Sequence, residues 1–198
     1  MTRLRVVLAT LAVLAVALAI AIGCRGRDAG EQDGAPVVDM ELMAFLSEAR
    51  ALHHQANLKE ESGDLPGAAA AMQRLVDARR PHEGTTKTPE IEEVLADAYA
   101  RLAELHLRQG ALGPAADAVK AGLAHAPEPT YFRGHLIEVE GLIEEARAGS
   151  LADAGKPEEA ARARDKAIQL LEEVVRIQDQ VIQRSLADRD AGGNEIPR

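Results

Sequence analysis

A short pattern built on glycine occurs three times in this chain and limits what it can fold into. Gly63, Gly110 and Gly155 each stand five residues before an alanine that opens a run of helix-forming residues, and the spacings between these glycines are 47 and 45 residues. A proline follows each glycine within four residues. Glycine just past the end of one helix and proline near the start of the next is a common arrangement between helices. The nearly equal spacing therefore predicts three successive helical hairpins.

The middle unit has small and large apolar residues at characteristic places. Ala103 and Ala115 would let its two helices approach closely, while Leu102 and Val119 fill the space around them. The positions that follow the order W-x₂-L-G-x₂-Y, A-x₃-F and P are Tyr99, Leu102, Ala103, His106, Ala115, Val119, Gly122 and Pro127. The unit thus resembles the tetratricopeptide repeat (TPR), and the resemblance implies a solenoid of stacked antiparallel helix pairs.

The first and third units match this pattern less well. The matching residues are Ala56, Gly63, Ala68 and Met72 in the first unit and Gly155, Ala160 and Ala167 in the third. Gln55, Glu144 and Arg164 stand where leucine, an aromatic residue and a large apolar residue are usual. The period also exceeds the usual value of about 34 residues. We expect an all-α fold, an α-solenoid of about three TPR-like hairpins over residues 38–187.

The glycines and prolines also predict where the helices begin and end. We expect helices near residues 38–62, 65–79, 90–109, 112–125, 129–153 and 157–187. The stretch "PHEGTTKTP" at residues 81–89 should be a loop, because both of its prolines disfavour helix. Residues 188–198 are expected to form a disordered tail.

The last predicted helix has an unusually wide apolar stripe. Ile168, Leu171, Val175 and Ile182 lie on one face, and Val174, Ile177 and Val181 lie beside them. Two interpretations remain open. The helix either folds over the open end of the array as a cap, or it presents part of the stripe to a second copy or to a partner protein.

The composition limits which residue types can form the core and which partners the chain can bind. Aromatic residues make up only 2% of the 198 residues, so the core must consist mainly of Ala, Leu, Val and Ile. The formal net charge is -9, which argues against a nucleic-acid partner, since phosphate binding needs a basic face. The single cysteine excludes an internal disulfide.

The first residues have the pattern of an export signal. Arg3 and Arg5 precede an uncharged run of 18 residues, 6–23, which ends in small residues before Cys24. The order Ile20 to Cys24 resembles the bacterial lipobox, which implies a lipoprotein-type signal peptide (residues 1–23) and acylation of Cys24, with palmitate among the acyl chains. An uncleaved membrane anchor is the alternative. Residues 24–37 are rich in Gly, Asp, Arg and Ala and should form a flexible tether.

Both interpretations of this segment place the domain in the bacterial cell envelope. Arg25 follows the cysteine directly, where an aspartate would be expected in a lipoprotein kept at the inner membrane. The resemblance therefore favours attachment to the outer membrane on its periplasmic side.

Motifs that would carry catalysis or bind a metal are missing from the sequence. The six histidines form no HExxH motif, and adjacent His53 and His54 would point about 100° apart on a helix. No phosphate-binding loop occurs, and the Glu-Glu pairs, such as Glu144-Glu145, fit solvated helix surfaces. We therefore expect no catalytic residues, no metal and no cofactor, and hence a protein that is not an enzyme.

The TPR resemblance also implies a binding groove lined by the first helix of each pair. The residues at its groove-lining places are Arg50, His53, Asn57, Glu60, Asp97, Ala100, Glu104, Arg108, Leu142, Glu145 and Asp153. This set is mixed but net acidic, so a protein or peptide segment with Lys or Arg would suit it. We expect a membrane-tethered scaffold for protein–protein interaction.

Two other functions remain open at this point. One is a helical metal- or cofactor-binding accessory domain of an envelope enzyme, using His53 or His106. The other is a structural dimer built on the last helix, with the groove unused.

Overall fold

The computed structural model describes residues 39–81 and 88–192. The chain divides into two units, Met1–Val38 and Asp39–Arg198, and all the described helices belong to the second. The predicted signal segment, Cys24 and the tether therefore lie outside the described residues, as do residues 82–87 and 193–198. Among the described helices, none combines the length and the hydropathy needed to cross a membrane.

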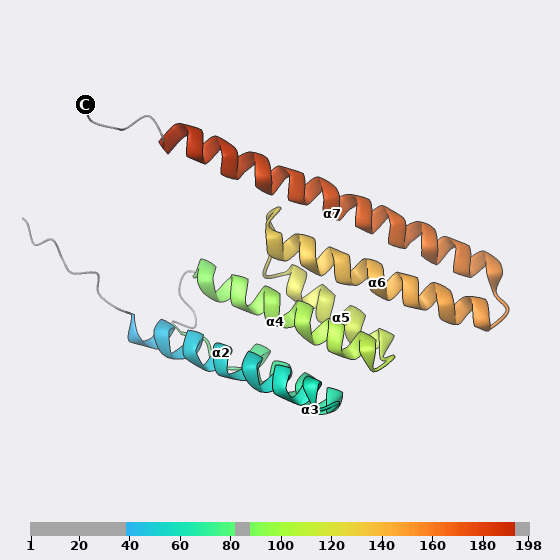
Figure 1. Cartoon of the computed structure of the whole chain (residues 1–198), viewed down its shortest axis with the longest axis horizontal. Helices are drawn as coiled ribbons and strands as arrows, with labels where there is room; N and C mark the ends of the chain where they lie inside the picture. Colours follow the sequence, from blue (N-terminus) through green and yellow to red (C-terminus); the bar gives the residue numbers. More distant parts are fainter. Residues whose placement is uncertain (1–38, 82–87, 193–198) are drawn as a thin grey trace, which may run out of the picture. The chain divides into compact units, whose positions relative to one another are not determined.

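The described part of the chain is helical throughout, without a strand, which confirms the expected all-α class (Figure 1). Its helices are α2 (Met40–Glu61), α3 (Leu65–Val76), α4 (Pro89–Arg108), α5 (Leu112–Leu123), α6 (Tyr131–Asp153) and α7 (Pro157–Gly192). The predicted boundaries lie within three residues of these, except at the end of α7.

Helix α7 continues five residues beyond its predicted end. The prediction of a disordered tail from residue 188 is therefore wrong for residues 188–192, and residues 193–198 lie outside the described part. The sequence becomes polar after Ser185, but it contains no helix-breaking residue before Gly192 and Gly193. Polar residues with adequate helix propensity do not by themselves end a helix.

The three repeated glycines form the turns inside the hairpins. Their φ angles are +82° at Gly63 and +73° at both Gly110 and Gly155, a left-handed conformation that glycine adopts without strain. The Gly63 amide donates to the carbonyl of Glu60 (2.9 Å), and the next amide donates to the carbonyl five residues before it. The same two bonds recur at the other two glycines. Each turn is thus a Schellman motif, which explains why glycine recurs at this spacing.

The helices pack in the order of the chain. Helices α2 and α3, α4 and α5, and α6 and α7 form antiparallel hairpins, and α3 packs on α4 as α5 packs on α6 (Figure 1). The first helices of the three pairs also contact one another in sequence, α2 with α4 and α4 with α6. This arrangement brings one face of each first helix onto a common surface.

Alanines allow the close approach of the helices in each pair. Ala68, Ala115 and Ala160, each five residues after a turn glycine, are fully buried. The large side chains that fill the remaining core are Met72, Leu75, Leu95, Leu105, Leu136, Ile143, Val119 and Val139. The core is thus mainly aliphatic, as the composition predicts.

Helix α7 lies close to α6 because small residues face it. A Cβ atom added at Gly141 would lie 3.4 Å from the Leu171 side chain, and one added at Gly134 would lie 2.6 Å from Nε2 of Gln178. Ala148, seven residues after Gly141, is also buried. This spacing of seven residues keeps the small side chains on one face of α6.

The carboxylate of Glu144 is buried between the same two helices. Its Oε1 lies 2.8 Å from Nζ of Lys166 on α7 and 3.2 Å from Nη1 of Arg147. The interpretation of Glu144 as a solvated surface residue is therefore wrong, because only 4% of it is exposed. The buried carboxylate is thus paired with two cationic side chains that are about half exposed. The Glu144 bond is also the main reason that the pKa of Lys166 is raised.

Candidate functional site

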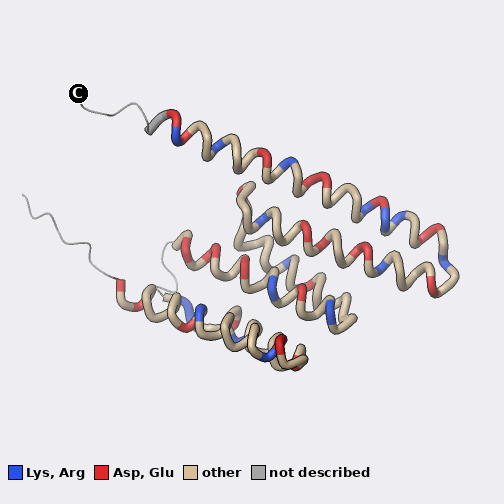
Figure 2. The backbone as a smooth tube through the Cα atoms, in the orientation of Figure 1, with Lys and Arg blue, Asp and Glu red and all other residues tan. Residues whose placement is uncertain are grey.

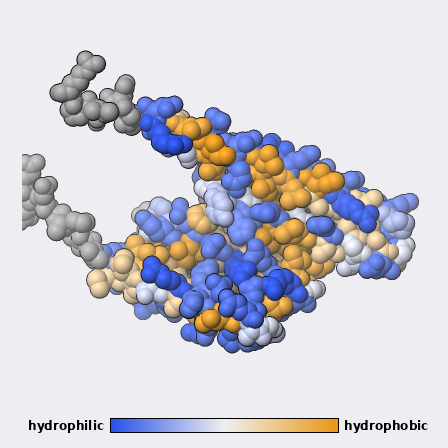
Figure 3. All heavy atoms as spheres, viewed as in Figure 1, coloured by the Kyte–Doolittle hydropathy of each residue, from blue (hydrophilic) through white to orange (hydrophobic). Residues whose placement is uncertain are grey.

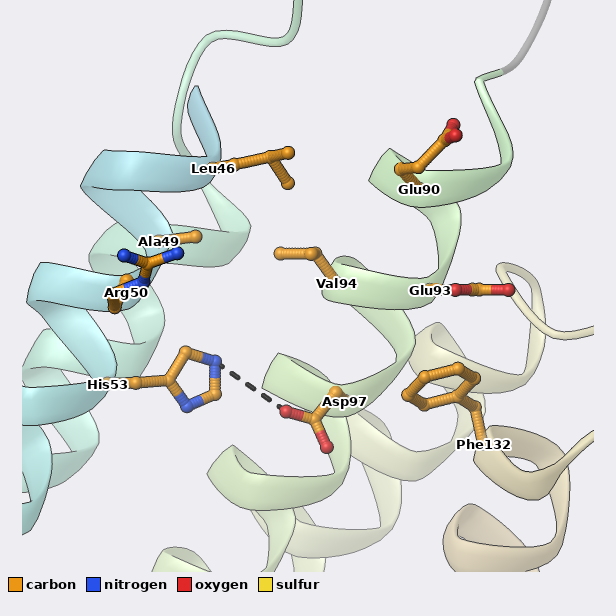
Figure 4. Close-up of a pocket in the computed structure, with 9 residues that line it drawn as sticks. All are labelled: Leu46, Ala49, Arg50, His53, Glu90, Glu93, Val94, Asp97 and Phe132. Atoms are coloured by element: carbon orange, nitrogen blue, oxygen red, sulfur yellow. Dashed lines mark ion pairs between the residues drawn. The ribbon is translucent and has the colours of Figure 1, made fainter. Parts of the chain in front are cut away.

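The surface shared by α2, α4 and α6, called here the first-helix face, contains an open cavity of about 500 Å³ (Figure 4). Its apolar walls are Leu46 and Ala49 of α2, Val94 of α4 and Phe132 of α6. Its polar residues are Arg50, His53, Glu90, Glu93 and Asp97. The lining thus combines apolar walls with charged groups, as is common in binding sites.

The charged groups around this cavity are predominantly acidic. Glu90, Glu93 and Asp97 come from one face of α4, where residues three or four apart are neighbours. In the part of the chain that the structure describes, Glu90, Glu93 and Arg50 take part in no ion pair. Nε2 of His53 lies 3.7 Å from Oδ2 of Asp97 (Figure 4). Burial nevertheless lowers the pKa of His53, so this imidazole is largely neutral at pH 7 and leaves the acidic balance unchanged.

An ion-pair network crosses the other end of the first-helix face. Glu60 of α2 pairs with both Arg101 and Arg108 of α4. Arg101 also pairs with Glu104 (2.9 Å), and Oε1 of Glu104 lies 3.1 Å from Nε2 of His135 on α6. Figure 2 shows acidic and basic residues interspersed along α2, α4 and α6. The network therefore links the first helices of all three pairs.

A second cavity of about 420 Å³ lies beside this network. Its lining residues are Asn57, Glu60, Glu61, Arg101 and Arg108. The charges of Glu60, Arg101 and Arg108 are already paired within the chain. This cavity consequently offers a partner less unpaired charge than the first one.

Six of the predicted groove residues lie at these cavities. Arg50, His53 and Asp97 line the first, and Asn57, Glu60 and Arg108 line the second. Glu104 lies in the ion-pair network. Leu142, Glu145 and Asp153 are exposed on α6 but line neither cavity.

The prediction is wrong for Ala100. This residue is fully buried and packs with Ala96, Ala126 and Leu136 in a small apolar cluster. Its side chain therefore supports the contact between α4, α6 and the segment after α5, and it is not available to a partner. The repeat pattern gives the position along the helix but not how deeply the neighbouring helix covers it.

The prediction also missed several residues of the site. Glu90, Glu93 and Val94 stand seven, four and three residues before the predicted Asp97, so extending the helical spacing by two turns would have found them. Phe132 and His135 come from the first turns of α6, where the repeat match was too weak to place them. Their position depends on how α6 packs against α4.

His135 should make the stability of the fold depend on pH. Its hydrogen bond to Glu104 raises the pKa of His135 above 6.5, and the same bond lowers the pKa of Glu104 below 4.5. The contribution of His135 is full below pH 6.5 and is lost as the pH rises through its folded-state pKa. The contribution of Glu104 is present above pH 4.5 and is lost as the pH falls through its lowered pKa.

The expected result is a melting-temperature difference between the wild type and His135→Gln that is largest near about pH 6 and smaller near about pH 9. Melting followed by circular dichroism at both pH values measures it. The comparison with the variant removes the contributions of His53 and His106, whose pKa values burial lowers and whose pH dependence has the opposite sign. An equal melting-temperature difference at both pH values would contradict the assignment of this pH dependence to His135.

Within the described residues, no three His, Cys, Asp or Glu side chains come together as a metal site would require. His53 and His106, the histidines of the metal-binding alternative, lie on α2 and α4. Comparisons of the chain with protein families, with curated proteins and with solved structures found no match.

Proposed function

We propose that this protein is a non-enzymatic interaction module that binds a segment of another protein on the first-helix face. The cavity between α2, α4 and α6 carries the proposal, since it offers apolar walls beside carboxylates that are not already paired. A partner residue such as Leu, Met or Phe would enter beside Leu46, Ala49 and Val94, which point toward one another (Figure 4). A neighbouring Lys or Arg would then lie near Glu90, Glu93 and Asp97.

The proposed architecture is a TPR-like α-solenoid. Its support is the recurrence of one Schellman turn at similar spacing, with packing between elements that follow each other in the chain. In such an array the first helices form the binding surface, which agrees with the position of the cavity.

We also propose that the module is tethered in the bacterial cell envelope through Cys24. This rests on the basic and apolar residues that precede the cysteine and on its resemblance to the lipobox. A tethered module would hold its partner near a membrane, with the acidic domain itself kept away from anionic headgroups. The substitution Cys24→Ser tests the proposed tether. Processing of the chain and its retention in the membrane fraction are the measurements.

Affinity capture with the full chain as bait, from an envelope extract of the source bacterium, tests the groove. Glu93→Lys reverses a charge at the cavity, and Asp117→Lys makes the same change of net charge on the exposed side of α5. A partner of the first-helix face should be retained by the wild type and by Asp117→Lys, and it should be lost with Glu93→Lys. With a purified partner, the affinity should fall by about tenfold.

Glu93 suits this experiment better than Glu104 or Arg108. The latter two side chains form ion pairs within the chain, so replacing them would also disturb the contacts between the helices. Circular dichroism of both lysine variants should match the wild type. If Glu93→Lys retains all the proteins that the wild type retains, the proposal for the groove is wrong.

A further inference from the structure

Helix α7 keeps a long apolar stripe uncovered. Its side toward α6 includes Ala163, Ala167 and Ile177, which are buried. The residues of the exposed stripe are Ile168, Leu171, Val175, Ile182 and Leu186, which are 40 to 60% exposed. Hydrophobic residues gather along α7 in Figure 3. Each of the two interpretations of the last helix therefore holds only in part. One side of α7 packs on α6, and no other described residue packs on the adjacent side, which carries the exposed stripe.

The repeat shows what covers these positions in the other two units. Ile168 stands 13 residues after its turn glycine, as do Val76 in the first unit and Leu123 in the second. Val76 is buried in the core cluster to which Ile91 and Leu95 of α4 belong. Leu123 packs on the cluster that contains Leu136 of α6. In both of these units the second helix packs on the first helix of the next unit, α3 on α4 and α5 on α6, whereas no described helix follows α7.

The position 16 residues after the turn glycine is likewise covered in the second unit and exposed in the third. Ala126 of the second unit is buried beside Leu136, and its counterpart in the third unit is the exposed Leu171. Arg164 stands at the start of the stripe, nine residues after its turn glycine. The residues at the same place in the other two units, Met72 and Val119, are buried and apolar. The uncovered surface is therefore the place of a missing helix beside residues 168–186.

The edge of α6 that borders the stripe can be identified from two contacts. Leu171 packs against Gly141, whereas Lys166, on the opposite side of α7, pairs with Glu140 and Glu144. The stripe therefore borders the other side of α6. The exposed residues on that side are Glu138, Leu142 and Glu145.

Acidic residues flank the stripe on both sides. Asp165, Glu172 and Asp179 are seven residues apart on α7, each within four residues of an apolar stripe residue. Glu138 and Glu145 are likewise seven residues apart on α6. Across the described part of the chain, none of these five carboxylates takes part in an ion pair. Two copies joined through their stripes would bring like charges together, which is unfavourable.

We propose that the stripe on α7 and the adjoining edge of α6 bind an amphipathic helix of another protein, with Lys or Arg beside its apolar face. The incoming helix takes the place that the first helix of a following repeat would occupy. Its apolar residues cover Ile168, Val175 and Ile182, and its basic residues lie near the two acidic rows. This site is separate from the cavity on the first-helix face and does not depend on the proposed function.

The test uses the purified full chain and two fluorescently labelled synthetic helical peptides. Both have Leu at heptad positions a and d; one has Lys at the flanking positions, and the other has Glu there. Fluorescence anisotropy should show binding of the Lys peptide, at least ten times tighter than that of the Glu peptide. Val175→Asp should weaken binding of the Lys peptide at least tenfold, and Val175 is exposed enough for the fold to tolerate the change.

Val175→Asp separates stripe binding from general attraction to an acidic protein. The added carboxylate would strengthen non-specific binding of a cationic peptide, so only a site that uses the apolar stripe predicts weaker binding. Gln169→Asp, one residue after Ile168 but outside the stripe, adds the same charge and should leave the affinity within twofold. Glu93→Lys changes only the first-helix face and should also have no effect.

Two outcomes would overturn the proposal. One is equal affinity of the Lys peptide for the wild type and Val175→Asp. The other is a wild-type dimer in sedimentation that becomes a monomer in Val175→Asp, because a second copy would then cover the stripe.

Discussion

Replacing Leu136 with alanine is expected to lower the free energy of unfolding by about 3 kcal/mol. Leu136 is fully buried on α6, where it packs with Ala96, Ala100 and Ala126. The buried neighbours are alanines, whose side chains cannot rearrange to fill the space, and only the partly buried Tyr99, Leu123 and Phe132 at the border of the cluster could move toward it. The loss therefore includes a cavity term in addition to the lost transfer free energy. For a domain of this size the melting temperature should fall by roughly 6–12 °C.

Leu142→Ala is the matched control, since it makes the same change on the same helix. The Leu142 residue is 38% exposed, so its loss should cost less than about 1 kcal/mol. Urea denaturation of both variants measures the difference, and the dependence on urea should keep the same slope. Equal losses for the two variants would show that α6 is not packed as described.

Gly122→Ala is expected to destabilise the fold by about 2 kcal/mol, although alanine is the better helix former. A Cβ atom at Gly122 would lie 2.5 Å from Cδ2 of Leu136 and 2.8 Å from Cβ of Tyr99. The Tyr99 Cβ atom is fixed to the backbone of α4, so the helices themselves would have to separate. Gly149→Ala on α6 is the control: nothing lies within 4 Å of its added Cβ, and it should stabilise by up to about 1 kcal/mol.

The two substitutions should not be additive. In the Leu136→Ala background the methyl group of Gly122→Ala no longer meets Cδ2 of Leu136, and only the Tyr99 contact remains. The cost of Gly122→Ala should therefore fall by about 1 kcal/mol in a double-mutant cycle. Strict additivity would mean that α5 and α6 do not meet at these residues.

The turns and helices could be predicted from the sequence because their causes are local. A left-handed residue between two helices favours glycine, and this requirement makes Gly63, Gly110 and Gly155 visible as a repeat. Helix boundaries follow from the same glycines and the nearby prolines. The one large error is the end of α7, because the polar residues 188–192 continue the helix.

The cavity could be predicted only in part. Arg50, His53 and Asp97 were placed by repeat position, which fixes the face of a helix toward which a residue points. Ala100 was misplaced because its burial depends on Leu136 of another helix. Phe132 reaches the cavity only because α6 packs beside α4.

The sequence by itself determined the helical hairpins, their three glycine turns and the alanines that let the helices of each pair approach. These features depend on backbone conformation and side-chain size within a few residues. Only the tertiary structure decided that the carboxylate of Glu144 is buried beside Lys166, that Val94 and Phe132 line the same cavity, and that the described stripe residues of α7 are exposed. Burial and charge pairing depend on the neighbouring helix, and neither the spacing nor the composition of one helix specifies which residues that neighbour brings.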